Sequence, residues 1–418
     1  MFSKILKSSF TLAKGSALSS LIIVLMTPLI TRYYDPSDFG LYGLVLSISS
    51  VVSVGLFFRF ELSLSQRKDY EFNGYFIGAF LIISSLLSVI LSLIVYASIN
   101  LHSEWSNDAL LITFFVFLSS WSFSGFYLLT ILSSRYGKYN YINKSKINRN
   151  ILISGLQVAL GVLSPTFFSL VISEVLGRIY ALLYLFINLK LNVRISLKYT
   201  KILILRNVGY LRYSFPAAFL NSATINVLPI LYPLVYGANS AGLVVLVTKI
   251  VAIPISLLGQ SLSTSYIGYV SIKENQSNYR AIRESLHKLI KILSAISLVV
   301  FLIIYIVLTY FGGFLFGTEW SNVGFIFLLL SPCLYFQIVF SSFSQSLNIF
   351  GLQKFQFFWD LIRLAIVVFS LLIPVFFEME NGSSKSLLCY SISMSIMYFI
   401  QFCYFDGYLK SKIKKLGL

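Results

Sequence analysis

Two short stretches, DPSDFGLYGLV at residues 35–45 and YGANSAGLVVLV at residues 236–247, indicate how the chain is built. Each joins the end of one apolar run to the start of the next through a tight turn, and each opens the second run with a Gly-Leu pair, beginning at Gly40 or Gly242. We therefore predict an internal repeat in which each half of the chain begins with two helices. Parallel repeats of this kind are typical of transporters that move one lobe against the other.

The composition around these stretches is that of a membrane protein. Hydrophobic residues make up 57% of the 418 residues and charged residues only 11%, whereas about a quarter of an ordinary soluble domain is charged. So much apolar surface cannot be hidden in a water-soluble core, and lipid has to be the solvent. The first apolar run lacks a small-residue cleavage site and is predicted to be a retained signal anchor.

Apolar runs long enough for helices that cross a bilayer recur along the whole chain, since such a helix needs roughly 20 mainly apolar residues. Residues 151–189 are too long for one crossing, and Ser164-Pro165 supplies a break between two helices. The predicted runs are 10–32, 38–60, 74–99, 108–134, 148–163, 166–189, 213–236, 240–267, 289–311, 323–350, 355–377 and 387–409.

The basic residues fix the predicted orientation. With twelve crossings, most of the 32 Lys and Arg residues fall in loops on one side, whereas the opposite loops hold Arg32 and Lys385. Because cytoplasmic loops are enriched in Lys and Arg, both ends of the chain are predicted to be cytoplasmic. The basic stretch 190–212 divides the chain into an N-terminal lobe (1–189) and a C-terminal lobe (213–418). The predicted fold class is an all-α integral membrane protein of about twelve helices in two six-helix lobes.

Charges inside the predicted helices carry the functional information. A charged side chain at the bilayer centre costs about 2.5–3.5 kcal/mol even on insertion scales, so it normally faces a partner or a watered cavity. Four basic and two acidic residues lie in the predicted helices: Lys14, Arg178, Lys249, Arg363, Glu174 and Asp360. The cations outnumber the carboxylates, and a net cationic path attracts an anionic substrate, for which phosphate is the obvious candidate.

A structural role for these charges is the alternative. Glu174 and Arg178 are spaced i, i+4, and Asp360 and Arg363 are spaced i, i+3, so each pair could neutralise itself on one helix face. Lys249 has no acidic neighbour at helical spacing. Lys14 lies closer to the cytoplasmic face and could extend its ammonium group to the interface.

Several other classes of protein are disfavoured. The basic residues are spread over short loops rather than gathered on one face, so we do not expect nucleic-acid binding. There is no G-x-x-x-x-G-K-[ST] loop for ATP, and His102 and His287 lie in predicted loops on opposite sides of the membrane, where they cannot share a metal. A membrane glycosyl-transfer enzyme is disfavoured because the outer loops are short. No catalytic residue and no cofactor is predicted.

Three stretches carry a family resemblance: PLITRYYDPSDFGLYGLV at 28–45, YSFPAAFLN at 213–221, and YGANSAGLVVLVTKIVAIPISLLGQSLSTSYIGYVS at 236–271. With the overall length and the twelve predicted helices, they resemble the Wzx-type polysaccharide flippases of the multidrug/oligosaccharidyl-lipid/polysaccharide (MOP) exporter superfamily, which also contains the MATE transporters. The resemblance extends over the whole chain, and its motifs are loose patterns rather than catalytic signatures.

The resemblance implies a function in polysaccharide biosynthesis. The implied substrate is an undecaprenyl-pyrophosphate-linked oligosaccharide, such as an O-antigen (lipopolysaccharide) or capsule-type repeat unit, moved across the bacterial inner membrane by alternating access. In such proteins a cationic central cavity receives the substrate, and the candidates here are Arg178, Lys249 and Arg363, with Lys14 at the entrance. Glu174 and Asp360 would serve coupling to H⁺ or Na⁺. Expected partners are the lipid-linked substrate, membrane lipids and other polysaccharide-assembly membrane proteins.

Three alternatives remain open from the sequence. An ion-coupled drug or small-molecule antiporter would share the fold, although such a site usually needs an excess of buried carboxylates. Export of a lipid-linked peptidoglycan precursor is close in chemistry, although the relatives known for that task carry two further helices. A membrane glycosyl-transfer enzyme is the alternative from another class.

Overall fold

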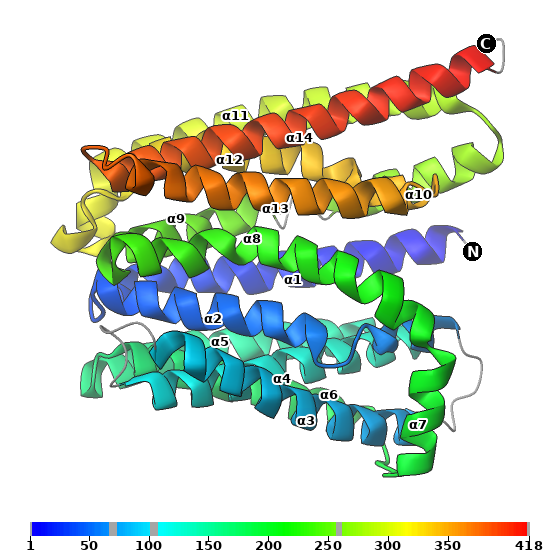
Figure 1. Ribbon diagram of the computed structural model, residues 1–418, viewed down its shortest axis with the longest axis horizontal. Coiled ribbons are helices and arrows are strands. Elements are labelled where there is room, and N and C mark those ends of the chain that lie inside the picture. Colours follow the sequence, from blue (N-terminus) through cyan, green and yellow to red (C-terminus); the bar gives the residue numbers. More distant parts are fainter. Residues whose placement is uncertain (1, 67–72, 101–107, 256–260, 416–418) are drawn as a thin grey trace. The chain divides into compact units, whose positions relative to one another are not determined.

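The protein is described here from a computed structural model covering residues 2–66, 73–100, 108–255 and 261–415 (Figure 1). All regular secondary structure in these ranges is helical. The α-helices are α1 (Phe2–Ile30), α2 (Pro36–Gly55), α3 (Asn73–Asn100), α4 (Ala109–Arg135), α5 (Tyr139–Leu163), α6 (Phe167–Asn188), α7 (Leu197–Arg206), α8 (Phe215–Tyr236), α9 (Ala238–Pro254), α10 (Ser261–Asn275), α11 (Tyr279–Phe316), α12 (Val323–Ser344), α13 (Gln353–Phe376) and α14 (Gly382–Lys415). Short 3-10 or π segments are η1 (Phe60–Gln66), η3 (Tyr210–Ser214), η5 (Thr318–Trp320) and η6 (Gln345–Asn348).

The helices confirm the predicted all-α membrane architecture. Each predicted apolar run overlaps an α-helix. Within the described ranges, nine helical stretches are long and apolar enough to cross a membrane, and α1 and α9 add the shorter apolar stretches Lys14–Ile30 and Ala238–Ala252. The first half of α5 is rich in polar residues. The chain is thus a multi-pass membrane protein, while the count of twelve crossings and the cytoplasmic placement of both termini stay predictions.

The run predicted as one helix at residues 240–267 includes residues 256–260, which lie outside the described residues. Helix α9 ends at Pro254 and α10 begins at Ser261. Proline has no amide hydrogen for the helical ladder, and its ring crowds the carbonyl of the preceding turn, so a helix commonly ends or bends there. Because the residues between Pro254 and Ser261 are only partly described, one continuous helix at 240–267 stays a prediction.

Packing divides the chain into two compact units. Unit 1 comprises Met1–Pro36 and Ser240–Leu418, and unit 2 comprises Ser37–Asn239. These units group the chain differently from the predicted lobes 1–189 and 213–418, because α1 packs with the second half of the chain and α8 with the first half. The two units are defined by packing alone. That residues 1–189 and 213–418 are the two lobes that move during transport stays a prediction.

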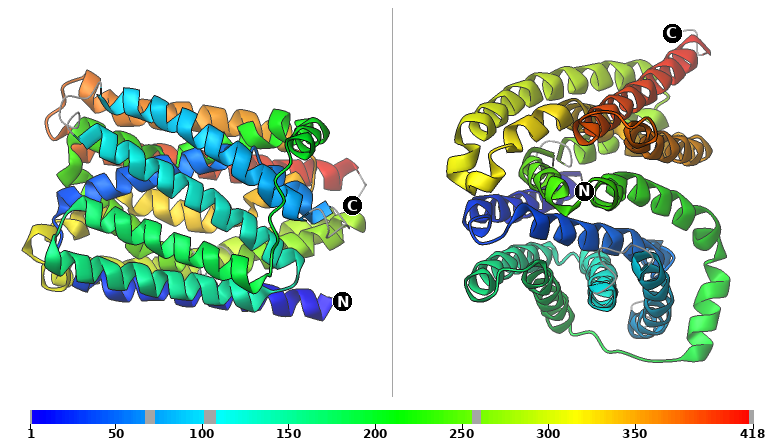
Figure 2. Two further views of the ribbon diagram at one scale, coloured as in Figure 1. Left: turned by 90° about the horizontal axis from the view of Figure 1, so that it is seen from below. Right: turned by 60° about the vertical axis from the view of Figure 1, so that its left-hand side comes forward.

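The predicted linker at residues 190–212 is partly helical. Figure 2 shows the extended chain that follows α6 and leads to α7. Helix α7 begins after Ser196, whose hydroxyl accepts a hydrogen bond from the Tyr199 amide at 3.3 Å, which satisfies one of the free amides of the first turn. Helix α7 then packs against α3.

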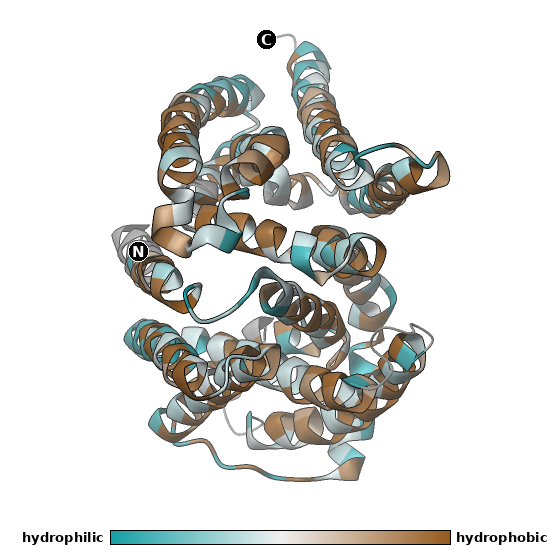
Figure 3. Ribbon diagram, turned by 90° about the vertical axis from the view of Figure 1, so that its left-hand side faces the viewer, coloured by the Kyte–Doolittle hydropathy of each residue, from teal (hydrophilic) through white to brown (hydrophobic). Residues whose placement is uncertain are grey.

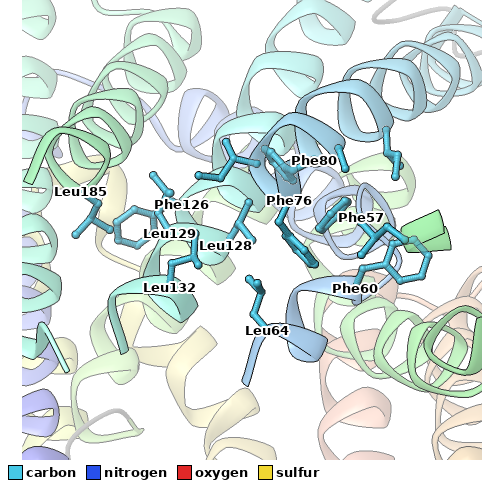
Figure 4. Close-up of a cluster of buried hydrophobic side chains, with 14 of the residues drawn as sticks. Phe57, Phe60, Leu64, Phe76, Phe80, Phe126, Leu128, Leu129, Leu132 and Leu185 are labelled. Atoms are coloured by element: carbon cyan, nitrogen blue, oxygen red, sulfur yellow. The ribbon is translucent and has the colours of Figure 1, made fainter. Parts of the chain in front are cut away.

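The core of unit 2 is built where α3, α4 and α6 meet (Figure 4). The Phe57 ring makes edge-to-face contacts with Phe60, Phe76 and Phe80, with ring centroids 5.3–5.7 Å apart. This is the preferred arrangement of aromatic pairs. Leu185 on α6 and Leu203 on α7 are buried in the same cluster, so this end of the unit is held together by one apolar core.

The core of unit 1 is built by α11, α12, α13 and α14, with α12 packed against both α11 and α14. The rings of Phe343 and Phe405 stack with centroids 5.5 Å apart. Trp320, which is 1% exposed, donates a hydrogen bond from its indole nitrogen to the Thr31 carbonyl at 3.2 Å. This bond ties the end of α1 to η5.

The two Gly-Leu pairs of the predicted repeat lie in equivalent contacts. In unit 2, a Cβ on Gly40 would lie 1.9 Å from the carbonyl oxygen of Ala238, and in unit 1 a Cβ on Gly242 would lie 1.7 Å from the carbonyl oxygen of Pro36. Each glycine therefore packs directly on the backbone that begins the other repeated helix, where no side chain fits. The matching contacts support the internal repeat.

Large apolar side chains are exposed along the helices, as expected for surfaces that contact lipid. In Figure 3 the apolar colouring runs along the helix bodies. Tyr310 and Phe314 of α11 are each 77% exposed, and Leu93 and Ile94 of α3 are also exposed. In a bilayer such residues face acyl chains rather than water.

Candidate functional site

The predicted charged residues are distributed over both units. Glu174 and Arg178 lie on α6 in unit 2, and the remaining four lie in unit 1: Lys14 on α1, Lys249 on α9, and Asp360 and Arg363 on α13. Four of these six residues form two ion pairs, Glu174 with Arg178 and Asp360 with Arg363. A single cavity that contains all four cations stays a prediction.

Glu174 is the centre of a buried polar cluster in unit 2. One oxygen of its carboxylate accepts a hydrogen bond from the Tyr42 hydroxyl at 3.0 Å, and the other forms an ion pair with Arg178, one turn later on α6. Gln157 of α5 also contacts Tyr42. Tyr42, Gln157 and Glu174 are all buried. The cluster therefore joins three helices, α2, α5 and α6, through one carboxylate.

Arg178 is held on two sides. Its guanidinium carbon lies 3.5 Å from the centroid of the Phe123 ring, in a cation–π contact with α4. The Arg178 side chain is 13% exposed, and its Nε is buried without a hydrogen-bond partner among the described residues. A buried donor without an acceptor is costly, so this nitrogen is available to an anionic ligand.

Arg149 and Lys146 of α5 add positive charge to this cluster. Gly177 lets α5 and α6 approach, because a Cβ there would lie 2.3 Å from Ile153 and 3.2 Å from the Arg149 carbonyl oxygen. The Arg149 side chain lies within electrostatic range of Glu174 and Arg178, and Lys146 lies within range of Arg149. We call Tyr42, Lys146, Arg149, Gln157, Glu174 and Arg178 the α6 cluster; it carries three positive charges and one negative charge.

Sequence reasoning missed Arg149 and Lys146, because both were counted among the basic residues that set the orientation. A signal for them was present. Ser145, Asn150, Ser154 and Gln157 recur at spacings of three to five residues, and all are buried. A polar stripe that continues into an apolar helix indicates a helix face turned toward other helices rather than toward lipid.

The second ion pair lies on α13 in unit 1. Arg363 Nη2 is 3.0 Å from Asp360 Oδ1, and both side chains are buried. The Arg363 guanidinium lies 5.8 Å from the Tyr398 ring, and Tyr390 and Cys333 lie within its electrostatic range. We call Asp360, Arg363, Cys333, Tyr390 and Tyr398 the α13 cluster; at neutral pH its one positive and one negative charge balance.

The other two predicted cations, Lys14 and Lys249, are not members of the two ion pairs described above. Lys249 is half-buried on α9, and Lys14 is exposed on α1. Neither residue belongs to the α6 cluster or to the α13 cluster as these were defined above. Their role in a cationic path therefore stays a prediction.

A further polar cluster joins α11 and α14. Asp406 Oδ1 accepts a hydrogen bond from Arg283 Nε at 2.7 Å and lies 2.9 Å from His287 Nε2, while Oδ2 lies 3.2 Å from Lys410 Nζ. The predicted loop position of His287 was wrong, because His287 lies on α11, which begins at Tyr279. His102 lies outside the described residues.

Glu61 is a buried carboxyl group in η1, where the chain turns between α2 and α3. Its Oε1 lies 3.8 Å from Arg59 Nη1, and Arg59 also donates to the Tyr127 hydroxyl at 3.4 Å. Burial raises the pKa of Glu61 to about 7, although a backbone hydrogen bond and the Arg59 charge act in the opposite direction. Glu61 therefore titrates near neutral pH.

Several solved structures have a similar fold. A multidrug resistance transporter of the MATE family (MOP superfamily) in its inward-facing conformation is 13% identical with a TM-score of 0.63, covering 97% of this chain and 95% of that chain. The outward-facing conformation of such a transporter is 14% identical with a TM-score of 0.57, covering 97% and 96%. The lipid II flippase MurJ in an inward closed conformation is 16% identical with a TM-score of 0.67, covering 96% and 87%.

The chain thus has the fold shared by these transporters and this flippase. Its sequence matches the family model of the polysaccharide biosynthesis proteins over residues 13–324, and the chain belongs to that family. A sequence search of curated proteins found no significant match.

Family and fold confirm the predicted resemblance to the polysaccharide exporters of the MOP superfamily. The chain is a membrane protein of the polysaccharide biosynthesis family, and the three solved structures named above, which share its fold, are transporters and a flippase rather than enzymes. Neither finding identifies the substrate.

Proposed function

We propose that this protein flips an undecaprenyl-pyrophosphate-linked oligosaccharide, an O-antigen or capsule-type repeat unit, across the bacterial inner membrane by alternating access. The observation that carries the proposal is the excess of positive charge in the α6 cluster, in which Arg149 and Arg178 lie near the single carboxylate of Glu174 and Lys146 lies near Arg149. Membership of the polysaccharide biosynthesis family and the fold of a lipid II flippase support the same class of substrate.

The chemistry of the α6 cluster suits a pyrophosphate. A guanidinium presents its donors in a planar fork that matches phosphate oxygens, and its charge persists at any physiological pH. The free Nε of Arg178 supplies such a donor in a buried setting. A substrate phosphate would add negative charge to a cluster in which Arg149 and Arg178 already lie near one carboxylate, and this interaction is stronger at a buried site than in water.

The remaining predicted residues have proposed roles in the same cycle. Lys14, Lys249 and Arg363 of unit 1 would contact the anionic substrate at other points of its path. Glu174 and Asp360 are the candidates for H⁺ or Na⁺ coupling. Each is ion-paired to an arginine of its own helix, so a coupling ion would have to compete with that guanidinium.

Charge-removing variants test the proposal. We would make Arg149→Gln, the double variant Glu174→Gln/Arg178→Gln, and the control Lys144→Gln, which removes an exposed charge from the same helix. Each would be expressed in a host whose own flippase gene is deleted, with surface polysaccharide and membrane abundance both measured. We expect polysaccharide to fall about 10–100-fold for the α6-cluster variants, the loss typical of removing a charged hydrogen bond, with Lys144→Gln unaffected.

Two outcomes would overturn the proposal. Wild-type polysaccharide from both α6-cluster variants would show that the cluster does not bind the substrate. No polysaccharide from the wild-type chain with any lipid-linked repeat unit, despite normal abundance, would point to another cargo.

The second candidate is an ion-coupled antiporter of small molecules. The similarity to a multidrug resistance transporter favours it, but the excess of cations in the α6 cluster does not suit cationic drugs. Drug susceptibility of a sensitised host would separate the two: resistance conferred by the wild-type chain, without any effect on polysaccharide, would favour the antiporter.

A further inference from the structure

Helix α7 and its flanking residues form a surface that the proposed function does not use. The chain before α7 is fixed to the start of α3, where the Arg194 amide donates a hydrogen bond to the Gly74 carbonyl at 3.0 Å. The Tyr199 ring of α7 packs on the Tyr75 ring of α3, with centroids 5.2 Å apart. These contacts hold α7 against the first turns of α3.

Two glycines of α3 make this close approach possible. A Cβ on Gly74 would lie 2.5 Å from the Asn192 carbonyl oxygen, and a Cβ on Gly78 would lie 2.2 Å from the Arg194 carbonyl oxygen. Thr200 and Leu203 of α7 are buried in the same unit. The inner face of α7 and its position along α3 are therefore defined by packing.

The opposite face of α7 combines exposed apolar and basic side chains. Leu197 is 74% exposed and Leu205 is 64% exposed, and Ile202 is also exposed. Three exposed basic residues lie between and after them: Lys198, Lys201 and Arg206. A face of this composition is typical of a helix that lies in a membrane interface, with apolar groups among the acyl chains and long basic side chains reaching the headgroups.

The depth of α7 agrees with an interfacial position. Helix α3 is one of the helices able to cross the membrane, and it begins at Asn73. Gly74, Tyr75 and Gly78 lie in its first turns, so α7 packs where α3 leaves the bilayer. Figure 1 shows α7 running across the direction of α3, as a helix lying along a membrane surface would.

The charge of the segment selects the type of lipid. Residues 190–212 contain six basic residues and no acidic residue. A polybasic segment beside a membrane-crossing helix is attracted to anionic headgroups. We propose that α7 binds the anionic phospholipid surface of the membrane, with Leu197 and Leu205 inserted among acyl chains and Lys198, Lys201 and Arg206 bound to lipid phosphates.

Spin-label accessibility tests the insertion. The label would be placed at Leu205→Cys in the full-length chain with Cys389 and Cys403 changed to Ser, and reconstituted in vesicles containing phosphatidylglycerol. A label at Glu284→Cys, an exposed position of α11, serves as the control in water. We expect the Leu205 label to collide with oxygen in preference to a water-soluble nickel reagent, and the Glu284 label to do the reverse. Equal water accessibility of the two labels would overturn the proposal and favour a protein partner for this surface.

Lipid affinity tests the charge. Native mass spectrometry would compare binding of phosphatidylglycerol and phosphatidylcholine to the wild type, to Lys198→Gln/Lys201→Gln/Arg206→Gln, and to the control Lys288→Gln/Lys291→Gln/Lys354→Gln, which removes the same charge from exposed positions elsewhere. We expect phosphatidylglycerol binding to weaken about fivefold for each α7 residue, roughly 100-fold in total. Equal affinity of the α7 variant and the wild type, or equal losses in both variants, would refute specific binding at α7.

Discussion

The α6 cluster of unit 2 and the α13 cluster of unit 1 begin from nearly the same local motif. Each places a carboxylate and an arginine one turn apart on a helix, and each sets the guanidinium near an aromatic ring: Phe123 in unit 2 and Tyr398 in unit 1. They differ in what neighbouring helices contribute. Helix α5 adds Arg149 and Lys146 to the α6 cluster, whereas the α13 cluster adds Tyr390, Tyr398 and Cys333, which are uncharged at neutral pH.

The difference shows that an i, i+4 or i, i+3 ion pair does not by itself decide whether a membrane site is charged. The two charges of the pair cancel, so the net charge of the cluster depends on the side chains that neighbouring helices contribute. The net charge of the α6 cluster in unit 2 is positive and suits an anionic group, whereas the charges of the α13 cluster sum to zero. The following predictions test where the two units behave alike and where they diverge.

The largest effect is expected at Gly40 and Gly242, the equivalent glycines of the two units. Gly40→Ala and Gly242→Ala would each place a methyl group within 2 Å of a backbone carbonyl oxygen, where no rotamer can relieve the overlap. We expect each to destabilise the protein by about 3 kcal/mol or more, as severe overpacking does, and to abolish its accumulation in the membrane. Fluorescence-detection size-exclusion chromatography measures this.

Gly155→Ala is the matched control, because a Cβ at this helical position meets nothing within 4 Å. It should be neutral or slightly stabilising, since Ala is a better helix former than Gly. Normal folding of Gly40→Ala together with loss of Gly242→Ala would break the equivalence of the two repeats.

Breaking the ion pair of either unit should destabilise the protein by a similar amount. Arg178→Ala and Arg363→Ala each leave a buried carboxylate without its partner, which typically costs about 3–5 kcal/mol. Replacing both partners, as in Glu174→Gln/Arg178→Gln or Asp360→Asn/Arg363→Gln, should restore most of the stability. Thermal unfolding in detergent measures both effects. A single variant as stable as the wild type would mean that water already solvates that pair.

Polysaccharide export should respond differently to changes in the α6 cluster and in the α13 cluster. Among variants that fold, Glu174→Gln/Arg178→Gln leaves the net charge of the α6 cluster unchanged but removes the Arg178 guanidinium, whose buried Nε is the proposed phosphate donor. We therefore expect polysaccharide export to fall about 10–100-fold. Asp360→Asn/Arg363→Gln removes an ion pair from a cluster that has no net charge, so we expect a smaller loss. A larger loss for the α13 double variant would place the principal anion contact, or the coupling site, in unit 1.

The smallest effect is expected at Glu61. Its pKa is about 7 in the folded protein and near 4.5 in the unfolded chain. The folded state therefore holds a proton that the unfolded state loses, and the associated stability is fully present below pH 4.5 and is lost as the pH rises through 7. Between pH 5 and pH 8 the wild type should lose a few degrees of Tm that Glu61→Gln does not lose. The exposed residue Glu284 provides the control substitution Glu284→Gln, and parallel Tm curves for all three proteins would refute the raised pKa.

The membrane class, the helical fold, the break between α5 and α6, and the repeat marked by Gly40 and Gly242 could all be predicted from the amino-acid sequence. These features depend on local patterns, because a run of about 20 apolar residues has few options other than a helix in lipid, and Gly permits a backbone approach that no other residue allows. The two ion pairs were also readable, since residues one turn apart on a helix meet whatever surrounds them.

The net charge of each buried site and the residues around it could not be predicted from the sequence, because they depend on how the helices pack. Arg149 resembles the other basic residues near a helix end until α5 packs on α6 and carries it beside Arg178. The grouping of α1 with the second half of the chain and the attachment of α7 to α3 likewise follow from contacts between residues far apart in sequence. Hydropathy and spacing describe one helix at a time, whereas the electrostatic character of a buried site is the sum over all the helices that meet there.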